Sequence, residues 1–179
     1  MLKSDLIVLT ETWLTEESLA DEYSLIGYKA NFNNRGRGKG IVSYYRGKFG
    51  TTRNINNDGF SISKMESEKL KVIGVYRSQD GDMANLINEI KSLVDSEKTT
   101  VIGGDMNVCA LTQRKNLVTK SLEEMGFKQL VTQATHEDGR ALDHIYIRQG
   151  KTARFDWAIE YFPKYYSDHD GVGLTMWEL

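Results

Sequence analysis

One stretch, residues 99–107, limits the folds open to this 179-residue chain more than any other. It reads TTVIGGDMN, an apolar, β-branched run typical of a buried strand that leads into the glycine pair Gly103-Gly104. The pair allows close backbone approach or a positive φ. Asp105 and Asn107, two residues apart, project on the same side of an extended chain. We therefore expect a strand whose end carries a carboxylate and an amide, suited to hold a hard cation and a water molecule.

The composition indicates a single globular domain with a sizeable core. Hydrophobic residues make up 40% of the chain, and charges of both signs are mixed along it. No apolar run approaches the roughly 20 residues that cross a bilayer, and no signal peptide opens the chain, so no membrane association is expected. The single cysteine, Cys109, excludes an internal disulfide and fits a reducing compartment.

The charge balance excludes a wholly basic nucleic-acid-binding protein, because the net charge is −2 and the pI is near 6.0. Basic residues gather instead in one segment without acids, from Arg35 to Arg53. This segment predicts a local positive face for a polyanion, with a solvated hairpin as the alternative. Its members are Arg35, Arg37, Lys39, Arg46, Lys48 and Arg53.

Hydrophobic periodicity predicts two helices among many short strands. One amphipathic helix is expected within residues 82–94, and a second, at 113–125, is expected to stop at Gly126. The glycine-rich residues 33–40 do not open a helix, so they are interpreted as a hairpin connection rather than a dinucleotide-binding loop. Strands are expected at 5–11, 28–32, 41–45, 60–63, 70–76, 99–104, 127–131, 141–148, 155–159 and 172–177. This pattern predicts an α/β sandwich of two sheets with helices packed outside, in one domain over residues 1–179.

Four acids stand at the ends of expected strands. Glu11 and Asp105 follow apolar runs, whereas Asp143 and Asp168 precede them. If these two pairs of strands run in opposite directions, all four acids meet at one sheet edge. His169 follows Asp168 directly and belongs to the same group.

Such a group of side chains favours phosphoester hydrolysis. Carboxylates at one edge repel one another unless a cation neutralises them, and oxygen ligands favour Mg²⁺ or Mn²⁺ over zinc. A neighbouring histidine suits proton transfer or binding of a phosphate oxygen. The metal would polarise the phosphoryl group, and water would be the nucleophile. Any one of these acids alone is more simply a turn or helix-cap residue, so the prediction depends on all of them occurring together.

Four short motifs, in this order, resemble the endonuclease/exonuclease/phosphatase superfamily, which includes the DNase I-like nucleases and the abasic-site endonucleases. They are LTETWL at 9–14, GGDMN at 103–107, LDHI at 142–145 and SDH at 167–169. The resemblance implies a DNase I-like two-sheet α/β sandwich. It also implies a Mg²⁺-dependent hydrolase, with Mn²⁺ as a second possible ion, that nicks DNA and leaves a 3′-hydroxyl and a 5′-phosphate.

The resemblance also implies roles for individual residues at the metal and the attacking water. Glu11 resembles the metal-binding glutamate, and Asp168 would assist at the metal. Asp105 resembles the aspartate that orients or deprotonates the attacking water, and Asn107 the amide that helps to hold the phosphate.

Further roles concern the phosphate and the DNA backbone. His169 resembles the histidine that contacts the scissile phosphate or, in another version of the mechanism, acts as general base, and Asp143 would orient it. Tyr76 matches a phosphate-side tyrosine, with an ordinary strand aromatic as the alternative. The basic side chains expected to bind substrate are Arg35, Arg37, Lys39 and Arg77.

Several details resemble the endonuclease domains of mobile elements, both LINE-type retrotransposons and Helitron-type transposons. These details are VYRS at 75–78, GFKQLV at 126–131, ATH at 134–136 and YSDHD at 166–170. The resemblance implies DNA as partner, reverse transcriptase or helicase modules in the same polyprotein, and an intracellular location in the nucleus or cytosol.

The chain also departs from the family pattern. The family begins with an Asn-bearing strand and a helix, whereas this chain starts at Met1 within the following strand. We therefore expect a domain truncated at its N-terminus that lacks this first strand and helix. Abasic-site selectivity is not expected, because Ala134, Arg140 and Leu142 offer no aromatic wall for a sugar pocket.

Two alternatives to a DNA-nicking enzyme remain open. One is a phosphatase or phosphodiesterase of the same fold that acts on lipid, inositol or nucleotide phosphates. The other is a non-catalytic binding remnant, suggested by the missing first strand.

Overall fold

The computed structural model describes residues 4–18, 20–36, 38–112 and 116–179. Its centre is a six-stranded sheet in the order β4-β5-β6-β7-β9-β8. Strands β6 and β7 run parallel, and every other neighbouring pair in this sheet is antiparallel. The strands are β4 (Gly50–Asn57), β5 (Phe60–Glu66), β6 (Leu70–Arg77), β7 (Thr99–Asp105), β8 (Lys128–Gln129) and β9 (Asp143–Arg148).

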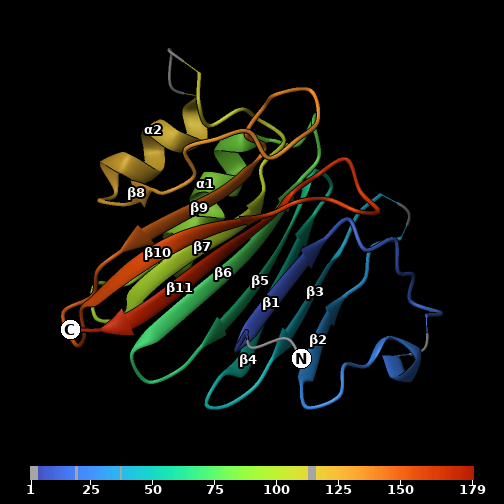
Figure 1. The fold of residues 1–179 in the computed structure, drawn as a ribbon, viewed down its shortest axis with the longest axis horizontal. Helices are drawn as coiled ribbons and strands as arrows, with labels where there is room; N and C mark the ends of the chain where they lie inside the picture. Colours follow the sequence, from blue (N-terminus) through green and yellow to red (C-terminus); the bar gives the residue numbers. More distant parts are fainter. Residues whose placement is uncertain (1–3, 19, 37, 113–115) are drawn as a thin grey trace.

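A second layer covers one face of this sheet in two separate pieces (Figure 1). One piece is a three-stranded sheet in the order β1-β3-β2, and the other is the antiparallel pair β10-β11. No described residue forms a strand that joins the two pieces through hydrogen bonds. The elements are β1 (Leu6–Thr10), the 3-10 helix η1 (Ala20–Tyr23), β2 (Lys29–Asn33), β3 (Ile41–Tyr45), β10 (Phe155–Phe162) and β11 (Gly171–Glu178).

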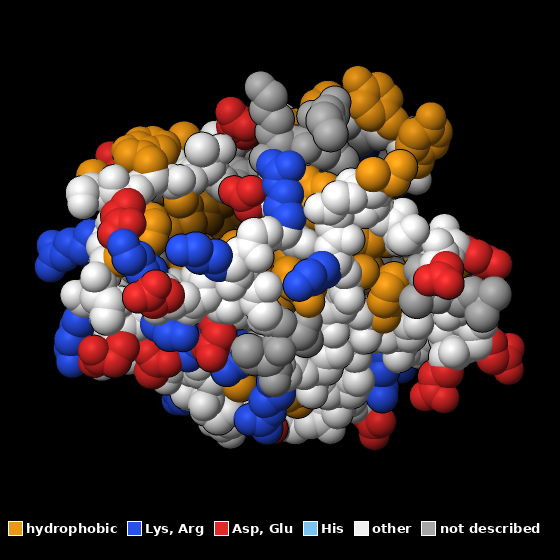
Figure 2. All heavy atoms as spheres, turned by 90° about the horizontal axis from the view of Figure 1, so that it is seen from below, with side chains coloured by type: hydrophobic (Ala, Val, Ile, Leu, Met, Phe, Trp, Pro, Cys, Tyr) orange, Lys and Arg blue, Asp and Glu red, His pale blue; other side chains and the backbone are white. Residues whose placement is uncertain are grey.

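The basic segment between Arg35 and Arg53 does not form one positive face. Arg35 and Lys39 are exposed in the β2–β3 connection, whereas Arg46 pairs with Asp5 at 3.0 Å, at the opposite end of β3. In the view from below, Lys and Arg side chains are interspersed with Asp and Glu at one end of the molecule (Figure 2). The predicted hairpin is confirmed, because β2 and β3 are antiparallel neighbours. Arg37 lies outside the described residues.

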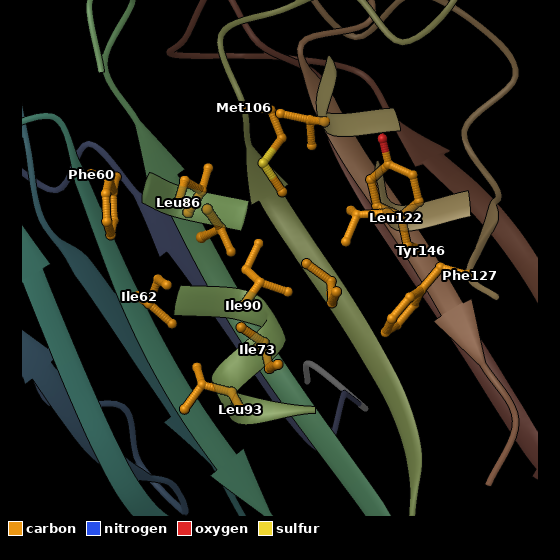
Figure 3. Close-up of a cluster of buried hydrophobic side chains, with 13 residues drawn as sticks. Phe60, Ile62, Ile73, Leu86, Ile90, Leu93, Met106, Leu122, Phe127 and Tyr146 are labelled. Carbon is orange, nitrogen blue, oxygen red and sulfur yellow. The ribbon is translucent and has the colours of Figure 1, made fainter. Parts of the chain in front are cut away.

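Helices α1 (Met83–Leu93) and α2 (Leu117–Glu124) cover the other face of the six-stranded sheet. The carboxylate of Asp82 starts α1 by accepting hydrogen bonds from the backbone N–H groups of the first turn. Leu86 and Ile90, four residues apart, pack from α1 onto Ile73 and other side chains of the sheet (Figure 3). Alternate residues of the same strands, such as Val72 and Val101, face the second layer instead. The sheet is therefore buried on both sides.

The predicted two-sheet α/β sandwich is confirmed, with local differences in individual elements. Strand β4 was not predicted, because its sequence GTTRNINN has little apolar alternation and its pairing with β5 forms the strand. The expected strand 127–131 shortens to Lys128–Gln129, since Leu130 and Val131 leave the sheet and pack into the core. The second helix begins at Leu117 and not at 113, because the Asn116 side chain caps it by accepting the Thr119 N–H; residues 113–115 lie outside the described residues. Among the residues described, no helix is long and apolar enough to cross a membrane.

Candidate active site

Strand register brings three functional side chains to one sheet edge. The antiparallel pairing of β7 with β9 sets Asp105 opposite Asp143, and the parallel pairing of β6 with β7 sets Tyr76 beside Asp105. Strand β1 ends at Thr10, so Glu11 joins the same edge through a hydrogen bond from the Tyr76 hydroxyl. The opposite strand directions assumed from the sequence are confirmed for β7 and β9. We call this edge, with Glu11, Tyr76, Asp105, Asn107, Asp143 and His169, the rim.

Asp105 is held in a buried position by its own loop. The residue is only 2% exposed, and its Oδ1 accepts a hydrogen bond from the Asn107 backbone N–H at 2.8 Å. The Asn107 side-chain amide donates to Asp105 Oδ2 at 3.2 Å and to the Arg77 carbonyl at 2.8 Å. The pKa of Asp105 is raised to about 7, and burial is the largest cause. The nearby carboxylates of Asp143 and Glu11 also raise this pKa, whereas the hydrogen bond from the Asn107 N–H and the charge of His169 lower it. A carboxylate with this pKa suits a general base near neutral pH.

His169 has the opposite electrostatic character. Its Nδ1 lies 2.8 Å from Asp143 Oδ2. This hydrogen bond is the largest cause that raises the pKa of His169 to about 9, against the lowering effect of burial. The imidazole is therefore a cation at neutral pH. Of the two roles predicted for His169, this charge favours contact with a phosphate oxygen over proton abstraction.

Tyr76 acts as a hydrogen-bond donor at the rim. Its hydroxyl lies 2.9 Å from Glu11 Oε1 and 2.9 Å from the Gly38 carbonyl oxygen. Burial, and then the hydrogen bond to Glu11, raise the pKa of Tyr76 well above its usual range, so the phenol stays protonated. Glu11 is exposed and Asn107 is half-buried, yet both have left-handed φ angles, of 50° and 49°. Such backbone strain in residues other than glycine is typical of functional sites.

Asp168 lies against His136, a histidine to which the sequence analysis assigned no role. Its Oδ2 is 3.2 Å from His136 Nε2, and His136 pairs with His169 in an isolated β-bridge. Among the described residues, one group of three side chains has all its possible metal-ligand atoms within 4.8 Å, and it contains His136, Asp168 and His169 but not Glu11. The ATH motif at 134–136 marked this segment, but only the bridge, which joins residues 33 positions apart, shows that His136 reaches the rim.

Arg77 corrects a prediction. The side chain was expected to contact phosphate, but the residue is only 1% exposed. Its guanidinium donates to the carbonyl oxygens of Met106 and Gly81 at 2.8 Å, of Gln79 at 2.9 Å and of Asn107 at 3.2 Å. Since these carbonyls take four of its five N–H groups, Arg77 fixes the loop that carries Asn107 and does not reach a substrate.

Arg35 and Lys39 lie beside the rim. Both are exposed, and together with Tyr76 and Ser78 they line a small surface depression beside the rim. Arg35 Nη2 donates to the Asn57 carbonyl at 3.3 Å, which leaves other guanidinium N–H groups for a ligand. The geometry is compatible with their predicted role in substrate binding.

The donor set of the rim fits a hard divalent cation. Its ligand candidates are carboxylate oxygens, and Glu11 and Asp143 lie near enough to Asp105 to raise its pKa. This mutual repulsion is the condition that a bound Mg²⁺ or Mn²⁺ relieves. Glu11, exposed and held by Tyr76, is the best-placed ligand.

Comparisons by sequence and by structure give different results. No protein-family model and no curated protein matches the sequence. Among solved structures, the endonuclease domain of TRAS1, a telomere-specific non-LTR retrotransposon, aligns at a TM-score of 0.65 and 13% identity, over 96% of this chain and 85% of that domain. Danio rerio TDP2 in complex with a single-strand DNA product aligns at 0.66 and 13% identity, over 96% and 85%.

Two further solved structures align over similar shares of the chain. The 3′ phosphatase NExo from Neisseria, bound to a product DNA hairpin, aligns at a TM-score of 0.67 and 13% identity, over 94% of this chain and 87% of that chain. An endonuclease/exonuclease/phosphatase family protein from Bacteroides thetaiotaomicron aligns at 0.64 and 17% identity, over 96% and 80%. The chain therefore has the DNase I-like fold of the endonuclease/exonuclease/phosphatase proteins.

Proposed function

We propose that this chain is a divalent-metal-dependent phosphodiester hydrolase that nicks DNA, leaving a 3′-hydroxyl and a 5′-phosphate. The observation that carries the proposal is the pairing of two oppositely tuned groups at one rim. Asp105, with a pKa of about 7, is a base at the pH where His169, with a pKa of about 9, is still a cation. Hydrolysis of an anionic ester needs both, a proton acceptor for water and a positive charge at the phosphate.

Each rim residue has a part in the proposed reaction. Asp105 Oδ accepts the proton of the attacking water, while Asn107 holds the carboxylate in place through two hydrogen bonds. The water oxygen bonds to phosphorus as the bond from phosphorus to the 3′-oxygen breaks, and the leaving 3′-oxygen takes a proton from solvent. The His169 imidazolium binds a non-bridging phosphate oxygen, and Asp143 keeps it charged and oriented. Glu11, supported by Tyr76, would hold Mg²⁺, which when bound supplies Lewis-acid polarisation of the phosphoryl group. The expected help of Asp168 in binding this metal ion remains a prediction.

DNA is the proposed substrate class. Arg35 and Lys39 are exposed beside the rim, where they suit contacts to phosphate rather than to bases. The structures of TDP2 and NExo hold DNA products, and TRAS1 is a retrotransposon protein. The likeness to TRAS1 supports the proposal of a mobile-element origin. Reverse transcriptase or helicase modules as polyprotein partners, and the nucleus or cytosol as location, remain predictions.

A panel of substrates tests the proposal against the phosphatase alternative. The 179-residue chain is incubated in Mg²⁺ with end-labelled duplex DNA, with an inositol phosphate and with a nucleoside monophosphate. We expect internal cleavage of DNA with 3′-hydroxyl ends and no release of inorganic phosphate from the monoesters. Phosphate release without internal cleavage would contradict the nuclease assignment.

An Asp105→Ala variant distinguishes catalysis from contamination. We expect its cleavage rate to fall at least about a hundredfold, the scale for loss of a proton-transfer group. Equal cleavage by wild type and variant would attribute the signal to a contaminant and favour a non-catalytic remnant.

A further inference from the structure

Three side chains that bind metals well meet beside the rim, and one of them, His136, has no part in the proposed reaction. The candidate ligand atoms of His136, Asp168 and His169 all lie within 4.8 Å of one another. His136 Nε2 is 3.2 Å from Asp168 Oδ2. The two imidazole rings are 4.8 Å apart between centroids and nearly perpendicular, at 83°.

Both imidazoles are oriented by a carboxylate at Nδ1. His169 Nδ1 lies 2.8 Å from Asp143 Oδ2, and His136 Nδ1 lies 2.8 Å from Asp138 Oδ1. The Asp138 backbone nitrogen also lies 3.2 Å from His136 Nδ1. His136 can bind an ion through Nε2 in the tautomer whose Nδ1–H donates to the Asp138 carboxylate rather than accepting from this backbone N–H. In the neutral tautomer whose Nδ1–H donates to a carboxylate, a histidine presents its Nε2 lone pair, which is the common arrangement around protein metal sites. An ion that binds His169 at Nε2 therefore displaces the proton that the metal-free imidazolium carries there.

The backbone holds the two segments together before any ion binds. His136 and His169 form a β-bridge, the Glu137 N–H donates to the Asp168 carbonyl at 3.0 Å, and the Asp170 N–H donates to the Thr135 carbonyl at 2.7 Å. The Thr135 hydroxyl is buried and accepts the N–H of Asp143 at 3.1 Å, which ties the turn to β9. The three side chains therefore project from a fixed frame.

The donor set selects the class of ion. Two imidazole nitrogens and one carboxylate oxygen suit borderline ions such as Zn²⁺, whereas Mg²⁺ prefers oxygen ligands alone. Ligand atoms on a tetrahedral zinc ion are about 3.3 Å apart, so the pair at 3.2 Å already fits. The other candidate ligand atoms, up to 4.8 Å apart, would have to move about 1–1.5 Å closer through side-chain rotation. The Asp168 side chain is 59% exposed, so its carboxylate is open to an entering ion.

The geometry points to a Zn²⁺-class binding site formed by His136, Asp168 and His169, separate from the hard-cation position at Glu11. Three protein ligands leave a fourth position for water. Because the site engages the imidazole of His169, a bound ion competes with the scissile phosphate for it, a consequence that rests on the proposed function.

Direct binding to the metal-free 179-residue chain tests the site without DNA. Titration with ZnCl₂ at pH 8 is followed by calorimetry, and titration with CoCl₂ by its visible d–d absorption. We expect one ion per chain, with a Co²⁺ spectrum typical of tetrahedral nitrogen and oxygen ligands. The absence of saturable Zn²⁺ binding would overturn the proposal whether or not the chain cleaves DNA.

Variants locate the ion. His136→Ala and Asp168→Asn should each weaken Zn²⁺ binding by more than about a hundredfold. Asp138→Asn, which loses the carboxylate beside His136 Nδ1 together with its ion pair to Arg140, should weaken binding by about 10–100-fold. Glu137→Gln changes an adjacent acid that pairs with Lys164 at 2.9 Å, and Cys109→Ser removes the thiol, so both should bind as wild type does. Loss of binding in Cys109→Ser, or full binding in both His136→Ala and Asp168→Asn, would contradict the assignment.

Discussion

At the scale of single residues, different surroundings make Asp105 a base and His169 a cation at the rim. Asp105 is buried next to two other carboxylates, and this raises its pKa to about 7. His169 is less buried and is hydrogen-bonded to Asp143, and this raises its pKa to about 9. The two shifts leave a window near pH 8 in which the carboxylate is deprotonated and the imidazole is charged.

The pH dependence of the rate follows from these two groups. Activity should rise as Asp105 loses its proton near pH 7 and fall as His169 loses its proton near pH 9. We expect a bell-shaped profile of kcat/KM with a maximum near the middle of this window. His169→Gln should lower the rate and remove the alkaline limb. A wild-type rate that keeps rising through the alkaline limb would argue against a cationic His169.

The same burial of Asp105 predicts an effect on stability. Between pH values of about 4 and 7 the folded chain binds a proton at Asp105 that the unfolded chain has released, so wild-type stability falls as pH rises through this window. Asp105→Asn removes this cost. In EDTA at pH 8 we expect the variant to have a free energy of unfolding about 2–4 kcal/mol above wild type.

Denaturant unfolding of both proteins at pH 4 and pH 8 measures this effect. The advantage of the variant should vanish at the lower pH, where the wild-type carboxyl is protonated. A variant that is no more stable than wild type at pH 8 would show that Asp105 is not strained by burial.

The sequence could identify the residues that stand in short motifs. Asp105, Asn107, Asp143 and His169 each follow or precede an apolar run, so their strand ends were predictable. The sequence could not predict the burial of Arg77, which depends on carbonyl groups from separate loops. His136 was equally hidden, because its contacts come from the β10–β11 connection.

At the scale of elements, the end of β7 positions the rim through a glycine. Gly104 has a φ of +139°, and a Cβ added there would lie 1.9 Å from the Val75 carbonyl oxygen. Strands β6 and β7 therefore approach closely only because Gly104 has no side chain. This close approach sets Tyr76 beside Asp105.

Substitution of the two adjacent glycines separates this effect from ordinary strand packing. Gly104→Ala should destabilise the fold by at least about 2 kcal/mol, since it adds both a clash and an unfavourable φ. Gly103→Ala is the matched control, because its Cβ would meet its nearest neighbour at 3.7 Å, and its effect should stay within about 1 kcal/mol. Thermal unfolding measures both, and equal shifts would contradict the special role of Gly104.

Elements with a strong apolar periodicity were predictable from the sequence, whereas strands that form only because a neighbouring strand pairs with them were not. Helix α1 and strand β3 lie where the apolar spacing placed them. Strand β4 has no such spacing and forms because β5 offers an edge to pair with. The division of the second layer into two pieces was also not predicted, since it depends on which strands become neighbours.

At the scale of the whole molecule, the charge distribution limits the affinity expected for the proposed DNA substrate. The net charge is −2, and basic residues of the 35–53 segment point to different ends of the second layer. Among the residues that the structure describes, few cations therefore lie near the rim, and Arg35, Lys39 and His169 are among them. Affinity for DNA should be modest and should depend on a small number of phosphate contacts.

The salt dependence of binding measures this number. With two to three phosphate contacts, the slope of log K against log salt concentration should be about −2 to −3 on duplex DNA in EDTA. Arg35→Gln should make the slope shallower by about 1, whereas Lys48→Gln, beyond the far end of β3, should leave it unchanged. An equal change in both variants would mean that binding is spread over the surface and not directed to the rim.

The central claim is that the rim hydrolyses phosphodiester bonds in DNA, and conversion of supercoiled plasmid to nicked circles in Mg²⁺ tests it most directly. The assay compares wild type with Asp105→Asn, which keeps the shape of the side chain and removes the base, at matched protein concentrations and with an EDTA control. We predict nicking by wild type that EDTA abolishes and that Asp105→Asn slows at least about a hundredfold. No nicked circles at any concentration of wild type, or equal nicking by the variant, would contradict the claim.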